Sequence, residues 1–195
     1  MSSEKRKYEL KARAESQEET RRRIVEATVE LHQEVGPART TVSEIARRAG
    51  VNRVTVYNHF PDDGELFAAC QHHFLAEHPL PDLAGPLAVE DPGERLRAVL
   101  RALYASYRER EPMTAKVLRD REAVPALDAL LVATMDVQQS GLADALAGSG
   151  GRHAHALVAL ALDFWTWSRL AREGLSDGEA ADLMAEVVAG SPSPR

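Results

Sequence analysis

The stretch that decides the fold is residues 41–60, TVSEIARRAGVNRVTVYNHF. Thr41 followed by Glu44 has the pattern of a capping box, which begins a helix. Gly50 suits the left-handed end of that helix, and Asn52 is a good N-cap for the next one. Two short helices separated by a three-residue turn have the spacing of a helix-turn-helix, whose second helix enters the major groove of DNA. The same pattern also fits an ordinary helical hairpin in a larger bundle.

Helices are predicted on both sides of this stretch. The helix before it has one apolar face and ends near Val35, because Gly36 and Pro37 stop a helix. The helix after it begins at Pro61 and runs to about Glu77, with acidic residues in its first turn. We therefore expect a charged arm over 1–19, which is either mobile or an extension of the first helix. A helix-turn-helix domain is expected over 20–67, which includes the start of a connecting helix over 62–77.

The rest of the chain also predicts helices. Four prolines between 79 and 92 mark the seam before a second domain over 78–190, and 191–195 are expected to form a disordered tail. Good helix formers fill the sequence, and alternating runs of Val, Ile and Thr are missing from it. The fold class is therefore predicted to be all-α. Helices are expected in the second domain near residues 93–109, 113–120, 125–147, 152–173 and 177–189.

Charge and composition narrow the function classes. Residues 1–60 hold twelve basic and nine acidic side chains, a balance of +3, which leaves −9 for the remainder of a chain whose net charge is −6. Such a split suits a DNA-facing end joined to an acidic body. The first residues are charged rather than apolar, and polar residues interrupt the apolar run 154–171. These features predict a cytoplasmic protein without a membrane span.

Residues 22–67 resemble the DNA-binding domain of the TetR family of transcriptional regulators. The most specific piece is Thr55-Val56-Tyr57-Asn58-His59-Phe60. A looser similarity lies in the second domain, at Ala161–Trp165 and the helix-loop-helix after it. The other positions that carry the resemblance are Ile24, Ala27, Gly36, Thr40-Thr41-Val42, Ile45-Ala46, Ala49-Gly50-Val51 and Leu66.

The resemblance implies a repressor that binds an inverted-repeat operator in double-stranded DNA and is released by a small-molecule effector. Arg53 is the best candidate for direct base reading, since a guanidinium pairs with both acceptors of a guanine. Tyr57 and His59 would bind phosphates. Alternatively, they would only pack against their helix or cap it. Asp63 stands where the family commonly has a phosphate-binding lysine, and Val54 where it has a small residue or proline. The full set of expected DNA-binding residues is Thr41, Ser43, Asn52, Arg53, Val54, Thr55, Tyr57, Asn58 and His59.

The second domain is expected to hold the effector and to form a homodimer. Large side chains there either line a ligand cavity or form plain core, and the absence of a buried cation would favour a neutral or cationic aromatic ligand. The last two predicted helices have wide apolar faces, which suit a four-helix interface with twofold symmetry. The expected pocket residues are Tyr104, Tyr107, Met113, Phe164 and Trp167. The expected interface residues are Leu183, Met184 and Val187.

Other kinds of site are less well supported. Cys70, His73 and Glu77 share a helix face and resemble a metal-binding set, but a buried Cys70 beside a surface His–Glu pair explains them better. The sequence holds neither a phosphate-binding glycine loop nor a GxSxG motif, so no catalytic residue, metal or cofactor is predicted. Two alternatives stay open, an all-helical enzyme and an architectural DNA-binding protein without a ligand.

Overall fold

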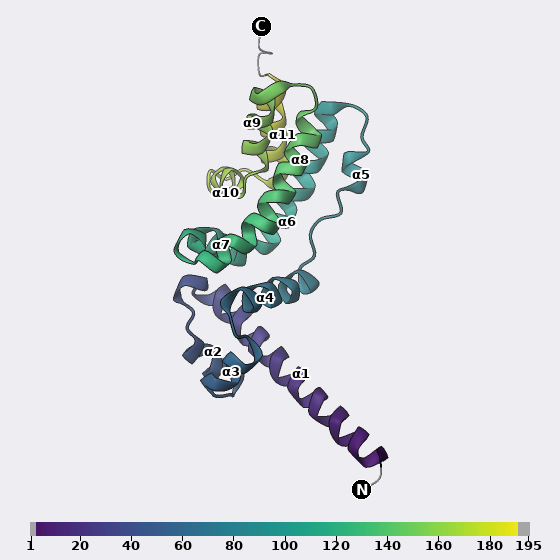
Figure 1. The fold of residues 1–195 in the computed structure, drawn as a ribbon. Coiled ribbons are helices and arrows are strands. Elements are labelled where there is room, and N and C mark those ends of the chain that lie inside the picture. The colour runs from purple at the N-terminus through teal and green to yellow at the C-terminus, as the bar shows by residue number, and fades with distance from the viewer. Residues whose placement is uncertain (1–2, 191–195) are drawn as a thin grey trace. The chain divides into compact units, whose positions relative to one another are not determined.

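The structure is a computed structural model that describes residues 3–190, and the side chains of residues 7–190 (Figure 1). The described residues form helices and connecting turns without a strand, so the all-α prediction is confirmed. The tail expected at 191–195 lies outside the described residues. None of the helices described here has the length and apolar character to cross a bilayer.

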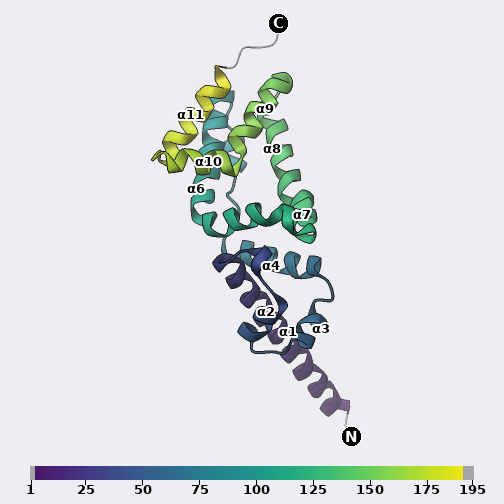
Figure 2. The same cartoon turned by 90° about the vertical axis from the view of Figure 1, so that its left-hand side faces the viewer.

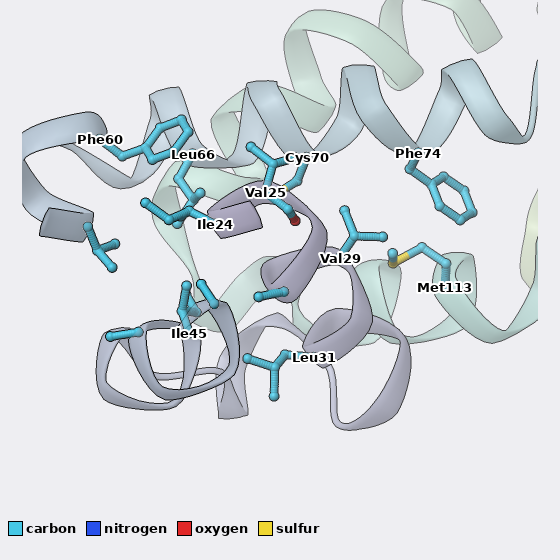
Figure 3. Close-up of a cluster of buried hydrophobic side chains, with 14 residues drawn as sticks. Ile24, Val25, Val29, Leu31, Ile45, Phe60, Leu66, Cys70, Phe74 and Met113 are labelled. Carbon is cyan, nitrogen blue, oxygen red and sulfur yellow. The ribbon is translucent and has the colours of Figure 1, made fainter. Parts of the chain in front are cut away.

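The chain divides into two compact units. The N-terminal unit comprises the residues up to Glu77 together with Pro112–Leu130, and the C-terminal unit comprises His78–Glu111 and the residues from Leu131 onward. The segment 112–130, expected in the second domain, therefore packs with the N-terminal helices instead. The reason is visible at Met113, whose side chain joins the N-terminal core beside Phe74 (Figure 3).

The N-terminal unit contains the helix-turn-helix. Figures 1 and 2 both show α2 and α3 next to each other, and α2 packs on α1. Over the described residues the charged arm is an extension of the first helix, one of its two expected forms, since α1 begins at Ser3. The elements of this unit are α1 (Ser3–Glu34), η1 (Pro37–Arg39), α2 (Val42–Ala49), α3 (Arg53–His59), α4 (Asp63–Glu77), the end of α6 (Pro92–Asp120), η2 (Arg121–Ala123) and most of α7 (Pro125–Leu131).

The helix boundaries in the helix-turn-helix follow from its capping residues. The Thr41 side chain accepts a hydrogen bond from the backbone N–H of Glu44 at 3.2 Å, and Asn52 Oδ1 accepts one from Thr55 N at 2.8 Å. Gly50 ends α2 with φ 66°, as a left-handed C-cap. The expected capping box is only half formed, because the Glu44 carboxylate pairs with Arg47 instead of the N-cap backbone.

An aliphatic core holds these helices together (Figure 3). Ile24 is fully buried, Val56 is 1% exposed and Ile45 3% exposed, so all three helices of the helix-turn-helix domain contribute. Burial of such side chains contributes about 1.5–3 kcal/mol each. The cluster consists of Ile24, Val25, Ala27, Val29, Leu31, Ile45, Ala46, Ala49, Val56, Phe60, Leu66, Cys70, Phe74 and Met113.

The turn between α1 and α2 is fixed by the end of α6. Asp120 Oδ2 accepts a hydrogen bond from Ala38 N at 3.0 Å, and Arg119 Nη2 donates to Val35 O at 3.2 Å. Gly36 lies between these two side chains with φ 94° and ψ 160°, a conformation that is nearly exclusive to glycine. A Cβ on Gly36 would lie 2.4 Å from Arg119 Nη2 and 2.5 Å from Asp120 Oδ2.

The C-terminal unit is also helical, with several differences from the expected boundaries. A short helix, α5 (Ala84–Leu87), lies within the proline-rich seam at 79–92. The helices expected at 93–109 and 113–120 are one helix, α6, which continues through Pro112. The helix expected at 152–173 breaks at Asp163, whose backbone is extended and whose carboxylate caps the next helix through Thr166 N at 2.8 Å. Besides the first part of α6, this unit contains α5 (Ala84–Leu87), η3 (Val132–Asp136), α8 (Val137–Ala147), α9 (Gly151–Leu162), α10 (Phe164–Arg172) and α11 (Asp177–Ala189).

Candidate functional site

Helix α3 presents one face to solvent and the other to the core. Val56 is buried, whereas Val54 is 66% and Tyr57 48% exposed. Arg53 and Asn58 are exposed as well. These four exposed side chains are among the residues expected to bind DNA, and α3 brings them together on one surface.

Arg53 is the basic residue of this surface that is free to bind. Neither a hydrogen bond nor an ion pair ties it to another residue in the described part of the chain. By contrast, Arg48 binds Glu34 with two hydrogen bonds of 2.6 and 2.8 Å, and Arg47 is held by Glu44. A guanidinium with unused donors on a solvent-facing helix suits the bidentate recognition of a guanine.

Asn52, Thr55 and His59 are less available. Asn52 Oδ1 accepts hydrogen bonds from both Thr55 N (2.8 Å) and Thr55 Oγ1 (3.0 Å). Thr55 and His59 are partly buried, while Asn52 stays exposed. Asn52 and Thr55 therefore stabilise the start of α3. Their contact with DNA would use the atoms that these two hydrogen bonds leave free.

The N-terminus of α2 forms the second part of the candidate surface. Thr41 caps the helix and Ser43 follows in its first turn, and both are exposed. Backbone N–H groups at a helix start attract phosphates. Asp63 is exposed in the first turn of α4, so the acidic departure from the family pattern faces solvent.

The aromatic residues of the C-terminal unit are packed on one another. Tyr104 and Trp167 are fully buried and Phe164 is 1% exposed, with the Tyr107–Phe164 and Phe164–Trp167 ring centroids 5.4 Å apart. Met113 does not belong with them, since it lies in the N-terminal core. Four of the five expected pocket residues are thus brought together, as a filled cluster.

Both tyrosine hydroxyls in this cluster bind the backbone where α9 ends. Tyr104 Oη donates to Ala161 O and Tyr107 Oη to Leu162 O, each at 2.7 Å. The break at Asp163 frees these carbonyls from their helical partners, and the hydroxyls take that place. Burial raises the pKa of Tyr107 to about 12 and also raises that of Tyr104, so both hydroxyls stay protonated donors.

The expected interface residues on α11 face two directions. Leu183 is 40% and Val187 44% exposed, and Leu160 on α9 is 50% exposed. Met184 is only 6% exposed and packs within its own chain, so it does not belong to the exposed set. The exposed leucines and valine are apolar side chains without cover in a single chain.

The helix face of Cys70, His73 and Glu77 is explained by a buried cysteine beside a surface His–Glu pair. Cys70 is 5% exposed, and burial raises the pKa of its thiol to about 12. His73 pairs with Glu77 at 3.6 Å. Across the described residues, no group of three or more His, Cys, Asp or Glu side chains is arranged to hold a metal ion.

Sequence reasoning missed several buried polar residues, and His32 and Arg110 are the two with basic side chains. His32 is 4% exposed and stacks on Phe67, and burial lowers its pKa to about 4 against the opposing charge of Asp120. Arg110 is 8% exposed, so the expectation that the second domain lacks a buried cation is wrong. The signal for Arg110 was its position, since it continues the apolar stripe of Val99, Leu103 and Tyr107 at helical spacing.

Comparisons with known proteins agree with this geometry. Residues 24–70 match a family described as "Bacterial regulatory proteins, tetR family". The HTH-type transcriptional regulator AcrR of Shigella flexneri is 34% identical over 93 residues, which are 48% of this chain and 41% of AcrR. BetI of Yersinia pestis, also an HTH-type transcriptional regulator, is 35% identical over 82 residues, 40% of this chain and 41% of BetI. The chain thus spans about two fifths of the length of these curated relatives.

Solved structures match over most of the chain. A transcriptional regulator from Rhodococcus sp. Rha1 is 25% identical with a TM-score of 0.59, and the match covers 86% of this chain and 95% of the other. A TetR-like transcriptional regulator from the same organism has a TM-score of 0.61 at 20% identity, covering 88% and 97%. The second similarity concerns the fold alone.

Proposed function

Because the chain belongs to the TetR family of bacterial regulatory proteins, we propose that it is a dimeric repressor that binds an inverted-repeat operator. Helix α3 would enter the major groove, and the N-terminus of α2 would hold a phosphate. The observation that carries this proposal is the exposed, unpaired Arg53 beside Val54, Tyr57 and Asn58. The protein would act by binding rather than catalysis, in the cytoplasm where its DNA lies.

The test of the reading surface is Arg53→Ala. Loss of a bidentate base contact should weaken operator binding by about 1–3 kcal/mol and relax the preference at one base position in each half-site. Fluorescence anisotropy against the operator and against single-base variants measures both effects. Arg169→Ala is the matched control, since it removes an exposed arginine that pairs with Glu173 in the C-terminal unit. If Arg53→Ala binds every sequence as the wild type does, Arg53 is not a base reader.

The basic part of α1 should add affinity without specificity. Lys7, Lys11 and Arg13 are exposed on this helix, and such side chains bind phosphates or the adjacent minor groove. Deletion of residues 1–14 should weaken binding to all sequences and lower the dependence of affinity on salt. An unchanged salt dependence would show that the segment makes no contact with DNA.

The proposed dimer would use the exposed faces of α9 and α11. A carboxylate at Leu183 would be buried unpaired between two subunits, which is strongly destabilising to an interface. Leu183→Glu should therefore run as a monomer in analytical ultracentrifugation and lose operator binding. Leu80→Glu is the control, because Leu80 is 46% exposed in a loop. A folded Leu183→Glu dimer would locate the interface elsewhere.

Release by a small molecule is the second part of the proposal. An effector bound to the C-terminal unit would favour a state that does not bind DNA, and operator DNA would weaken effector binding by the same factor. The packed aromatic cluster favours a second candidate function, an architectural DNA-binding protein without an effector. A screen by thermal shift, followed by operator-release assays with the hits, separates the two.

A further inference from the structure

The C-terminal unit contains a buried cation. Arg110 on α6 is 8% exposed, and an arginine side chain stays protonated in proteins. Burial lowers the pKa of the Arg110 guanidinium, against the opposing influence of Tyr107 and Glu109. A charge removed from water is costly unless an opposite charge compensates for it.

Arg110 has no such partner among the described residues. Its guanidinium donates from Nε to Ser106 O at 3.2 Å and from Nη2 to Ser106 Oγ at 2.6 Å, and both acceptors are neutral. Several other arginines do pair with an anion, for example Arg108 with Asp177 at 2.8 Å and Arg119 with Asp120 at 2.6 Å. Arg110 is therefore a buried charge held by a serine alone.

The Arg110 guanidinium also has an unused side. Nη1 makes no hydrogen bond to any residue that the structure describes. Within that part of the chain, no side-chain nitrogen or oxygen is both sealed from solvent and unpaired, so Nη1 remains accessible. Nη1 can therefore donate to a further acceptor without loss of an existing hydrogen bond.

Apart from the exposed Glu109, which makes no ion pair with it, Arg110 has polar or aromatic neighbours that are neutral. The Tyr107 hydroxyl lies close enough for the two groups to influence each other's titration, since Arg110 opposes the burial that raises the Tyr107 pKa. Gln139 Nε2 donates to Tyr107 Oη at 3.2 Å. The Tyr107 ring continues into the aromatic cluster through Phe164 and Trp167. The region thus combines a lone cation with an apolar wall.

From this arrangement we propose that Arg110 recognises an anionic effector, a small organic carboxylate with an apolar body. The carboxylate would accept hydrogen bonds from the free edge of the guanidinium, a pairing whose planar geometry suits both groups. The apolar body would lie beside the Tyr107 ring. This inference deepens the proposed function, because it rests on the C-terminal unit being the effector-binding part.

The test compares charged and neutral ligands of the same shape. Benzoate, 2-naphthoate and decanoate are titrated at constant ionic strength against the corresponding amides, with thermal shift and calorimetry as readouts. At least one carboxylate should raise the melting temperature of the wild type, while its amide binds at least tenfold more weakly. Equal binding of acid and amide, or no binding by any carboxylate of the series, would overturn the proposal. Inorganic phosphate is included, and stabilisation by phosphate alone would also overturn it.

Variants locate the site. Arg110→Met should abolish stabilisation by the carboxylate, and without ligand it should melt no lower than the wild type, because it removes an uncompensated buried charge. Arg101→Met is the matched control on the same helix, since Arg101 is exposed and pairs with Asp182 at 2.8 Å. A melting temperature of unliganded Arg110→Met well below that of the wild type would assign Arg110 a structural role and contradict the proposal. The acid–amide comparison in the wild type decides the matter even if Arg110→Met does not fold.

The operator assay distinguishes this inference from the proposed function. A carboxylate that binds through Arg110 but leaves operator affinity unchanged would support the site and refute release by this effector. Operator release by a neutral molecule, equally strong in Arg110→Met, would support the proposed function and refute the anionic effector.

Discussion

In the N-terminal unit, the residues expected to bind DNA lie outside an aliphatic core, whereas in the C-terminal unit the residues expected to bind a ligand are the core itself. Val54 and Tyr57 are exposed on α3, while Tyr104 and Trp167 are fully buried and bonded to neighbouring groups. A surface that reads DNA has to be rigid and outward-facing before its partner arrives. An effector site built from Tyr104 and Trp167 would, by contrast, share its groups with the core that stabilises the fold.

The largest expected effect tests whether the aromatic cluster is core. Trp167→Ala should lower the free energy of unfolding by about 3–5 kcal/mol, since it removes a fully buried side chain and leaves Asp177 without its indole partner at 2.9 Å. Denaturant unfolding measures the loss. Trp165→Ala is the control on the same helix, because Trp165 is 41% exposed. This variant should lower the free energy of unfolding much less. Similar losses for both would mean that Trp167 does not belong to the core.

The second effect concerns the one buried titratable histidine described in the N-terminal core. The pKa of His32 falls from 6.5 to about 4 in the folded protein, so the unfolded chain binds more protons between these values. Stability should be full above pH 6.5, fall as the pH decreases toward 4, and level off below it, with a total loss of about 3 kcal/mol from this group.

The measurement is urea unfolding from neutral pH to about pH 4, for the wild type and His32→Gln. The difference in stability between the two should shrink as the pH falls. His153→Gln, a change at an exposed position, should follow the wild type throughout. A constant difference between His32→Gln and the wild type would show that His32 does not titrate in this range.

The third effect compares a buried and an exposed hydroxyl. Tyr107→Phe leaves Leu162 O and Gln139 without their partner, and an unsatisfied buried group costs about 1–3 kcal/mol. Tyr57→Phe removes an exposed hydroxyl and should change stability by less than about 0.5 kcal/mol, while weakening DNA binding if the hydroxyl holds a phosphate. If Tyr107→Phe and Tyr57→Phe changed the stability in thermal unfolding equally, the buried hydroxyl would contribute no more to stability than the exposed one.

The smallest effect should be the same in both units. Asn52 caps α3 and Asp163 caps α10, each with a hydrogen bond of 2.8 Å. Replacement of either by alanine should cost about 1 kcal/mol in thermal unfolding, because capping depends on local geometry. Only Asn52→Ala should also weaken operator binding. A loss several times larger for Asp163→Ala would show that its carboxylate does more than cap the helix.

The contrast between the two units also explains which features could be predicted from the sequence alone. Asn52, Gly50 and Thr41 determine the helix ends of the N-terminal unit through local hydrogen bonds, so their pattern predicted the helix-turn-helix. The break at Asp163 was missed because the apolar periodicity runs through it, and the hydroxyls that stabilise the break come from Tyr104 and Tyr107, more than 50 residues away.

Two further errors have the same cause. Separate helices were expected at 93–109 and 113–120, yet α6 continues through Pro112. Met113 was expected in the ligand pocket, yet it packs in the N-terminal core. Asp120 binds Ala38 across a sequence separation of 82 residues. Local patterns carry no information on such contacts, which tertiary packing alone determines.

The single cysteine offers a way to time the opening of one unit. Thiol reagents attack the thiolate, and burial holds the pKa of Cys70 at about 12, so in mildly alkaline buffer they should modify only molecules whose N-terminal core has opened. Cys70 is the only cysteine of the sequence, so the modification rate reports on the N-terminal unit alone. Operator DNA should slow this reaction in proportion to its occupancy. A change in rate on adding an effector would measure the coupling at this one position without any engineered label.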